Sequence, residues 1–121
     1  VDWKSRAYCD IATAQAKTNP EDANQIFKIA IETADQIQDY DDKSIAYCAI
    51  ATAQAKTNPK EAKQTAYQIQ RVDWKSRAYC AIATEQAKTN FEDAKQTVDQ
   101  IQDDYEKSKA YCAIAAAFLP Q

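Results

Sequence analysis

The feature that most constrains the fold is a segment that occurs four times. It is marked by a Tyr-Cys pair at Tyr8-Cys9, Tyr47-Cys48, Tyr79-Cys80 and Tyr111-Cys112, in steps of 39, 32 and 32 residues. A period of this size indicates a repeat array, in which each unit has one apolar face that it can bury only against its neighbours. The sequence therefore predicts a single repeat domain over residues 1–121, with units at about 2–40, 41–72 and 73–104 and a terminal helix over 105–119.

Composition indicates that the units are helical. The chain contains no glycine, histidine or methionine. Because the tight turns of β-proteins normally need glycine, its absence favours helices. The abundant Ala, Gln, Lys and Glu residues are also good helix formers. We therefore expect an all-α protein of about seven helices.

Apolar stripes and stop signals divide the chain into helices of two kinds. First-type helices are predicted at about 3–17, 42–56, 74–88 and 105–118, and second-type helices at about 20–38, 59–70 and 91–102. Asn19, Asn58 and Asn90 are expected to cap the second-type helices, followed twice by a proline at the first helical position. The first unit is about seven residues longer, which predicts one or two extra turns and then a short extended return through Asp39-Tyr40.

Charge and cysteine content bound the partners. A net charge of −3 argues against a general nucleic-acid binder, and no apolar run approaches the roughly 20 residues that span a bilayer. Equivalent cysteines on successive units should lie about 8–10 Å apart or more, whereas a disulfide needs Cα atoms within about 7 Å. We expect free thiols that act as small, half-buried packing residues, and hence a reducing, cytoplasmic location. A thiolate metal site has neither a histidine nor a close Cys-x-x-Cys pair to support it. The start at Val1, which repeats Val72, suggests a piece of a longer chain.

At the level of the unit, the sequence resembles the tetratricopeptide (TPR) repeat. The matching positions are Tyr79 at the first aromatic, Ile82 and Ala83 at the Leu and small residue, Gln86 at the next large residue, Asn90 at the Gly, and Ala94, Val98 and Ile101 in the partner helix. The departures are a period of 32 residues rather than about 34, a missing closing proline, Gln for an aromatic and Asn for Gly. The resemblance implies a right-handed α-solenoid of antiparallel helix pairs. Another helical-hairpin solenoid, such as a HEAT-like array, is the alternative.

In TPR proteins the first helices line a concave groove that binds extended peptides. The resemblance therefore implies a mildly basic groove lined by Arg6, Thr13, Lys17, Thr52, Lys56, Arg77, Thr84, Lys88 and Lys109. An acidic segment or a C-terminal carboxylate would be a fitting protein or peptide ligand, since Lys and Arg supply charge-assisted hydrogen bonds. The competing interpretation is that the lysines suit helix C-termini and that duplication copied them.

The C-terminal end departs from the other units. Where the third unit has Glu85-Gln86-Ala87-Lys88, the last one has Ala117-Phe118-Leu119-Pro120, so it has lost polar residues and gained Phe118 and Leu119, and no second-type helix follows. An exposed apolar strip of this kind predicts a contact with the next segment of a longer chain or self-association with a second copy. Alternatively, the two residues fold back over the last second-type helix as a cap.

Catalysis has almost no support in the sequence. There is no histidine to act as a base and no glycine loop to hold a phosphate, so we expect no enzyme, no cofactor and no metal. The predicted function is a protein- or peptide-binding interaction module. The alternatives are a structural spacer within a longer array and an engineered or consensus-like repeat with no native ligand.

Overall fold

The computed structural model describes residues 3–118, apart from the side chains of Lys4, Ser5, Tyr8, Cys9 and Ala16. Within this range the protein is all-helical and has no strand. The helices are α1 (Trp3–Ala16), α2 (Pro20–Asp35), α3 (Tyr40–Gln54), α4 (Pro59–Tyr67), α5 (Val72–Ala87), α6 (Phe91–Asp99) and α7 (Asp104–Ala117). The predicted number of seven helices and their order are confirmed.

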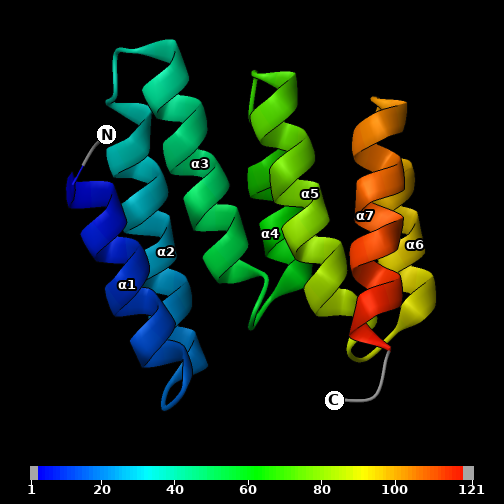
Figure 1. The fold of residues 1–121 in the computed structure, drawn as a ribbon. Coiled ribbons are helices and arrows are strands. Elements are labelled where there is room, and N and C mark those ends of the chain that lie inside the picture. The colour runs from blue at the N-terminus through cyan, green and yellow to red at the C-terminus, as the bar shows by residue number, and fades with distance from the viewer. Residues whose placement is uncertain (1–2, 119–121) are drawn as a thin grey trace.

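The helices form two layers, as Figure 1 shows. The first layer holds α1, α3, α5 and α7 side by side, and the second layer holds α2, α4 and α6 behind them. Consecutive helices run in opposite directions. Each second-layer helix packs against the first-layer helices that precede and follow it, and successive first-layer helices also pack against one another, so both kinds of contact join neighbouring units. The second-layer helices make no extensive contact with one another in the described part of the chain.

Small side chains at the helix crossings build the core between the layers. Ala23, Ala62 and Ala94 are fully buried at the equivalent position of the three second-layer helices. Ile50, Ile82 and Ile114 face them from the first layer and are equally enclosed. Burial of the set predicted from the repeat is confirmed for Tyr47, Ile50, Ala51, Tyr79, Ile82 and Ala83. The small residues let the helices approach closely, and the isoleucines fill the remaining space.

The turns need no glycine, because no described residue has a positive φ angle. The side chains of Asn19, Asn58 and Asn90 accept hydrogen bonds from backbone N–H groups at the starts of α2, α4 and α6, as predicted. Asp39 and Asp103 cap α3 and α7 in the same way. The chain therefore reverses direction with ordinary backbone angles and side-chain caps.

The second-layer helices end about three residues earlier than predicted. The backbone N–H of Ile69 donates to the carbonyl of Ala66, and Ile101 donates to Val98, so the last turn tightens and the helix stops. Ile69 and Ile101 then point into the core from the segment beyond the helix. Their apolar period extends past the true helix ends, and for this reason the predicted ends were too late.

The longer first unit is explained by α2. It has 16 residues, whereas α4 and α6 have 9 each, and the difference of seven residues corresponds to about two helical turns. The prediction of extra turns is confirmed. The placement of the return through Asp39-Tyr40 was wrong by about two residues, because the non-helical stretch begins after Gln36 and Tyr40 already opens α3.

A buried polar pair links the two helices of the second and third units. The Thr65 hydroxyl donates to the side-chain oxygen of Gln54 at 2.6 Å, and Thr97 donates to Gln86 in the same way. Both threonines and Gln54 are almost fully enclosed. In the first unit Ile26 occupies the threonine position. Gln54 and Gln86 therefore each have a hydrogen-bond partner in the threonine of the following helix.

Candidate functional site

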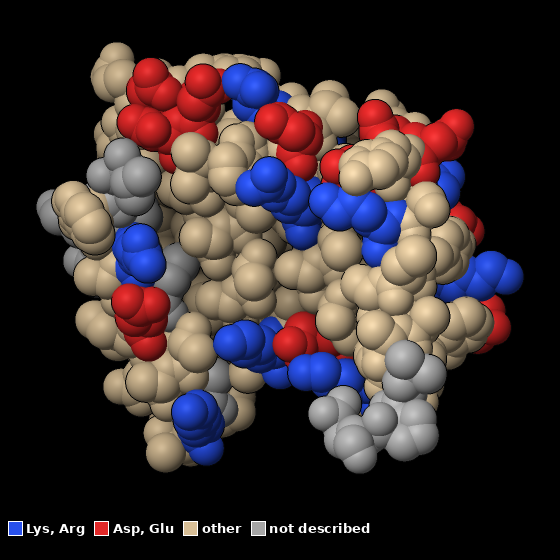
Figure 2. Space-filling view, viewed as in Figure 1, with Lys and Arg blue, Asp and Glu red and all other residues tan. Residues whose placement is uncertain are grey.

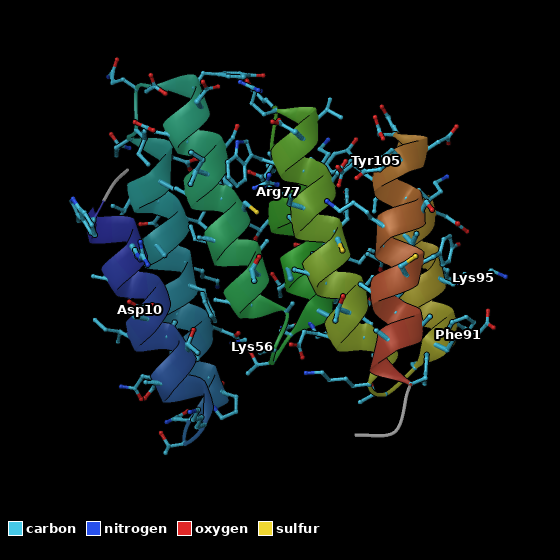
Figure 3. All side chains as sticks on the ribbon, in the orientation of Figure 1. Asp10, Lys56, Arg77, Phe91, Lys95 and Tyr105 are labelled. Carbon is cyan, nitrogen blue, oxygen red and sulfur yellow. The ribbon has the colours of Figure 1, made fainter. Side chains whose placement is uncertain are left out.

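The predicted groove residues lie on the outer face of the first layer (Figure 2). Arg6, Arg77 and Lys109 stand near the starts of α1, α5 and α7, whereas Lys17, Lys56 and Lys88 follow the ends of α1, α3 and α5. Lys and Arg accordingly gather in an upper and a lower band, with mostly uncharged surface between them. Figure 3 places Arg77 in the upper band and Lys56 in the lower one. All six cations are exposed. We call this surface the basic face.

The cations of the basic face differ in how far they are neutralised. Lys88 pairs with Glu85 at 3.2 Å, and Lys109 lies 3.9 Å from Glu106. The Arg77 guanidinium lies over the Trp74 ring, 4.6 Å from its centroid. Among described residues, no carboxylate lies within ion-pairing distance of Arg77 or Lys56. The same holds for Arg6 and Lys17, so these four side chains are available to an acidic ligand, and Arg77 and Lys56 lie on the central helices.

The predicted threonines lie between the two bands and are half-buried. The hydroxyls of Thr52 and Thr84 each donate to the backbone carbonyl four residues earlier, at 2.8 Å, in α3 and α5 respectively. Thr13 occupies the corresponding place in α1. A ligand could use the remaining lone pairs of Thr52 and Thr84, but their protons are already committed to the helix.

The cysteines are free, as predicted, at the three positions whose side chains are described: Cys48, Cys80 and Cys112. Cys9 lies outside the described side chains. Burial raises the pKa of Cys48 and of Cys80. Since the thiolate is the reactive form, both thiols are weak nucleophiles at neutral pH.

Phe118, which directly follows α7, lies against Phe91 at the start of α6. The two rings meet edge to face, with centroids 5.8 Å apart. Phe91 stands where the other two units have Pro20 and Pro59, so this aromatic pair is particular to the last unit. Phe118 remains 56% exposed, and Leu119 lies outside the described residues. The structure therefore contains the cap contact for Phe118, while a contact with a further partner stays a prediction.

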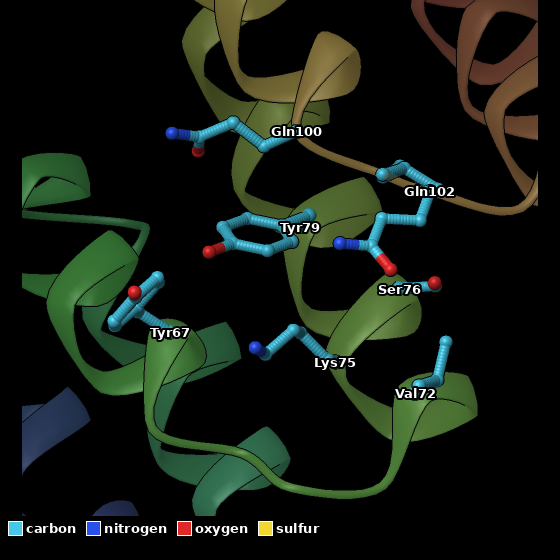
Figure 4. Close-up of a pocket in the computed structure, with 8 residues that line it drawn as sticks. Tyr67, Val72, Lys75, Ser76, Tyr79, Gln100 and Gln102 are labelled. Atoms are coloured by element: carbon cyan, nitrogen blue, oxygen red, sulfur yellow. The ribbon is translucent and has the colours of Figure 1, made fainter.

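A second candidate site lies where α4, α5 and α6 meet, and the sequence did not suggest it (Figure 4). At the two equivalent junctions of the fold, a tyrosine of the first layer is hydrogen-bonded to the preceding second-layer helix. The Tyr47 hydroxyl donates to Asp35, and the Tyr111 hydroxyl donates to Asp99 at 2.8 Å. The equivalent Tyr79 has Tyr67 in the aspartate position, and a cavity of about 250 Å³ opens beside it.

The signal for this site was present in the sequence but was not used. The segments that end the second-layer helices read Asp-Gln-Ile-Gln-Asp at 35–39 and 99–103, and Tyr-Gln-Ile-Gln-Arg at 67–71. Aligning the three turns would have isolated the two exchanged positions. The effect of the first exchange depends on the tyrosine 12 residues later, and only the fold brings that tyrosine next to it.

Other classes of site find little support in the described part of the molecule. No group of three or more His, Cys, Asp or Glu side chains there could hold a metal ion. None of the described helices combines the length and the apolar character needed to cross a membrane. Comparison with protein-family models, curated proteins and solved structures finds no match to this chain.

Proposed function

We propose that the protein is an α-solenoid interaction module of TPR-like helical hairpins that binds an extended acidic segment of a partner protein across the basic face. The two-layer order of antiparallel helices supports the solenoid assignment. The observation that carries the binding proposal is the exposure of Arg77 and Lys56, without carboxylate partners among described residues, on adjacent helices of one face.

The chemistry of the basic face fits such a ligand. The face carries six exposed cations, and Asp and Glu side chains lie on it as well, chiefly along its upper edge (Figure 2). The strip between the bands is built of small side chains such as Ala81 and Thr84, which leave room for an extended backbone. Arg77 can donate two parallel hydrogen bonds to a carboxylate while its plane stays on Trp74.

The test is a fluorescence anisotropy titration with a labelled acidic peptide over a series of salt concentrations. Changing Arg77 and Lys56 together to Ala should weaken binding by about 5- to 30-fold, since each exposed ion pair contributes roughly 0.5–1 kcal/mol. The affinity of the parent protein should fall as salt rises, because exposed charges are screened.

The matched control is the pair Lys60→Ala and Lys95→Ala. These lysines are exposed on α4 and α6 in the second layer, and the change removes the same charge from the other side of the molecule. The control should bind like the parent. Equal losses for both double variants would mean that only net charge matters, and tight binding that survives both changes would favour a spacer role for the basic face.

A further inference from the structure

The junction of α4, α5 and α6 holds two adjoining cavities of about 250 and 420 Å³. They share Tyr67 at the end of α4, Tyr79 on α5 and Gln100 just after α6. The smaller cavity is also lined by Lys75, Ser76 and Gln102 (Figure 4). We call it the tyrosine pocket. It exists because α4 and α6 make no extensive contact with each other, so the space between their ends is roofed only by side chains.

The only charged residues that line these two cavities are lysines. Lys75 lines the smaller cavity and Lys63 the larger one, and no Asp or Glu lines either of them. The Lys75 ammonium lies 5.0 Å from the centroid of the Tyr67 ring, which keeps the cation at the pocket. A third cavity, which shares Val72 and Ser76 with the smaller one, is lined by Asp73, Asp103 and Glu106. The lysines therefore favour an anionic occupant at the Tyr67 end of the pocket, away from these carboxylates.

The hydrogen-bond pattern specifies the kind of anion. Tyr79 is only 3% exposed, and its hydroxyl, which lies on the side of Tyr67 and Gln100 in Figure 4, donates to no protein acceptor in the described structure. The hydroxyl is the part of this side chain that reaches solvent, because no buried side-chain polar atom among the described residues lacks a partner. In the neighbouring units the same tyrosine donates to a carboxylate, that of Asp35 or Asp99. The third unit has kept the tyrosine and the lysine but has lost the carboxylate that the other units supply.

Protonation suits the donor role. Burial, with a further contribution from Tyr67, raises the pKa of Tyr79, so its hydroxyl stays protonated at neutral pH. Ser76 and the amides of Gln100 and Gln102 offer additional donors on the same cavity wall.

We propose that the tyrosine pocket binds a carboxylate, which accepts the hydrogen bond of the Tyr79 hydroxyl and pairs with the Lys75 ammonium. The ligand group takes the place that Asp35 and Asp99 hold in the other units. The carboxylate can belong to a free small acid or to a Glu side chain of a peptide. The site lies beside the second layer, and it is separate from the basic face.

The experiment follows the ring resonances of Tyr67 and Tyr79 by NMR on protein with ¹³C-labelled tyrosine. The probes are glutarate and a capped peptide with one Glu, each compared with its amide counterpart, glutaramide or the Gln peptide. The acids should shift both rings, and replacing the acid by the amide should weaken binding about 10-fold, as for a lost charge-assisted hydrogen bond. Stronger binding of the Glu peptide than of glutarate assigns the carboxylate to a peptide, and the reverse assigns it to a small acid.

The variants test the replacement directly. Tyr67→Asp restores the residue of the sister units, fills the pocket with an internal carboxylate and should reduce acid binding about 10-fold. Tyr79→Phe removes the donor and should have a similar effect, read on the Tyr67 ring. The matched control is Tyr111→Phe, which removes a hydroxyl already bound to Asp99 and should leave binding unchanged.

Two results would overturn the proposal. One is that acids and amides shift the two rings equally or that neither shifts them. The other is that Tyr67→Asp, shown to be folded by its spectrum, binds glutarate as well as the parent. Changing Arg77 and Lys56 to Ala should not alter these shifts, so failure of this site and failure of the basic face are read separately.

Discussion

The three turns that lead from the second layer into the first differ at their first and last residues. All three contain Gln-Ile-Gln, and two are flanked on both sides by aspartate. In those two, the first aspartate binds a tyrosine and the second caps the next helix. The remaining turn, at 67–71, has Tyr67 and Arg71 at these places, so α5 has no side-chain cap and a pocket opens beside it. The central Gln-Ile-Gln is common to the three turns and supplies the isoleucine of the core, whereas the flanking residues vary and change the surface.

Arg71 replaces the lost cap with a different connection. Its guanidinium pairs with Asp41 near the start of α3 and lies 3.3 Å from Asp73 near the start of α5. The capping interaction within one helix is thus exchanged for an ion pair between adjacent first-layer helices. Because these groups are largely exposed, the exchange contributes little to stability.

The largest expected effect tests the claim that the inner isoleucine holds the turn. Ile69→Ala and Ile101→Ala should each lower the free energy of unfolding by about 2–4 kcal/mol, since both side chains are at most 2% exposed. Ile37→Ala should cost less, about 1–2 kcal/mol, because Ile37 is only partly buried. Urea denaturation measures all three. Equal losses of stability at the three positions would contradict the conclusion that Ile37 is less buried than Ile69 and Ile101.

A smaller effect compares the units through their buried polar pair. Thr97→Val should cost about 1–3 kcal/mol in the free energy of unfolding, because it leaves the Gln86 side-chain oxygen without its donor. The exposed Thr18→Val is the control and should change stability by less than about 0.5 kcal/mol. If Thr97→Val were neutral, the pair would be incidental, and the isoleucine found in the first unit would serve equally well.

The smallest effect separates the flanks. Asp103→Ala removes the cap of α7 and should destabilise the protein by about 1 kcal/mol. Arg71→Ala removes only exposed ion pairs and should cost about 0–0.5 kcal/mol. Thermal unfolding of the two variants at low and high salt makes the comparison. A greater loss for Arg71→Ala, sensitive to salt, would show that the pairing with α3 outweighs the cap it replaced.

Much of the fold could be predicted from local signals. Asn19, Asn58 and Asn90 marked the helix starts, because capping depends on residues within one turn. The length difference between units was enough to predict the extra turns of α2. The ends of the second-layer helices were predicted too late, because Ile69 and Ile101 continue the apolar period after the helix has stopped.

The candidate sites were predictable to different degrees. The basic face depends on helical spacing within each unit, so its residues could be grouped on one side before the structure was known. Which of its cations are neutralised depends on neighbours such as Glu85 and Trp74, whose side-chain positions the pattern does not specify. The tyrosine pocket depends on residues contributed at three helices, and one feature that defines it is Tyr67 in the place of Asp35 and Asp99.

The layout of the contacts has a consequence for how the chain folds. Every extensive helix contact in the described residues joins helices that are at most two apart in the chain. No such contact ties α1 to α7, so no long loop must close before apolar surface is buried. Chains with mainly local contacts fold fast, and a folded pair can extend in either direction. We therefore expect the protein to fold quickly and to open from its two ends inward, with α3, α4 and α5 exchanging their amide hydrogens last.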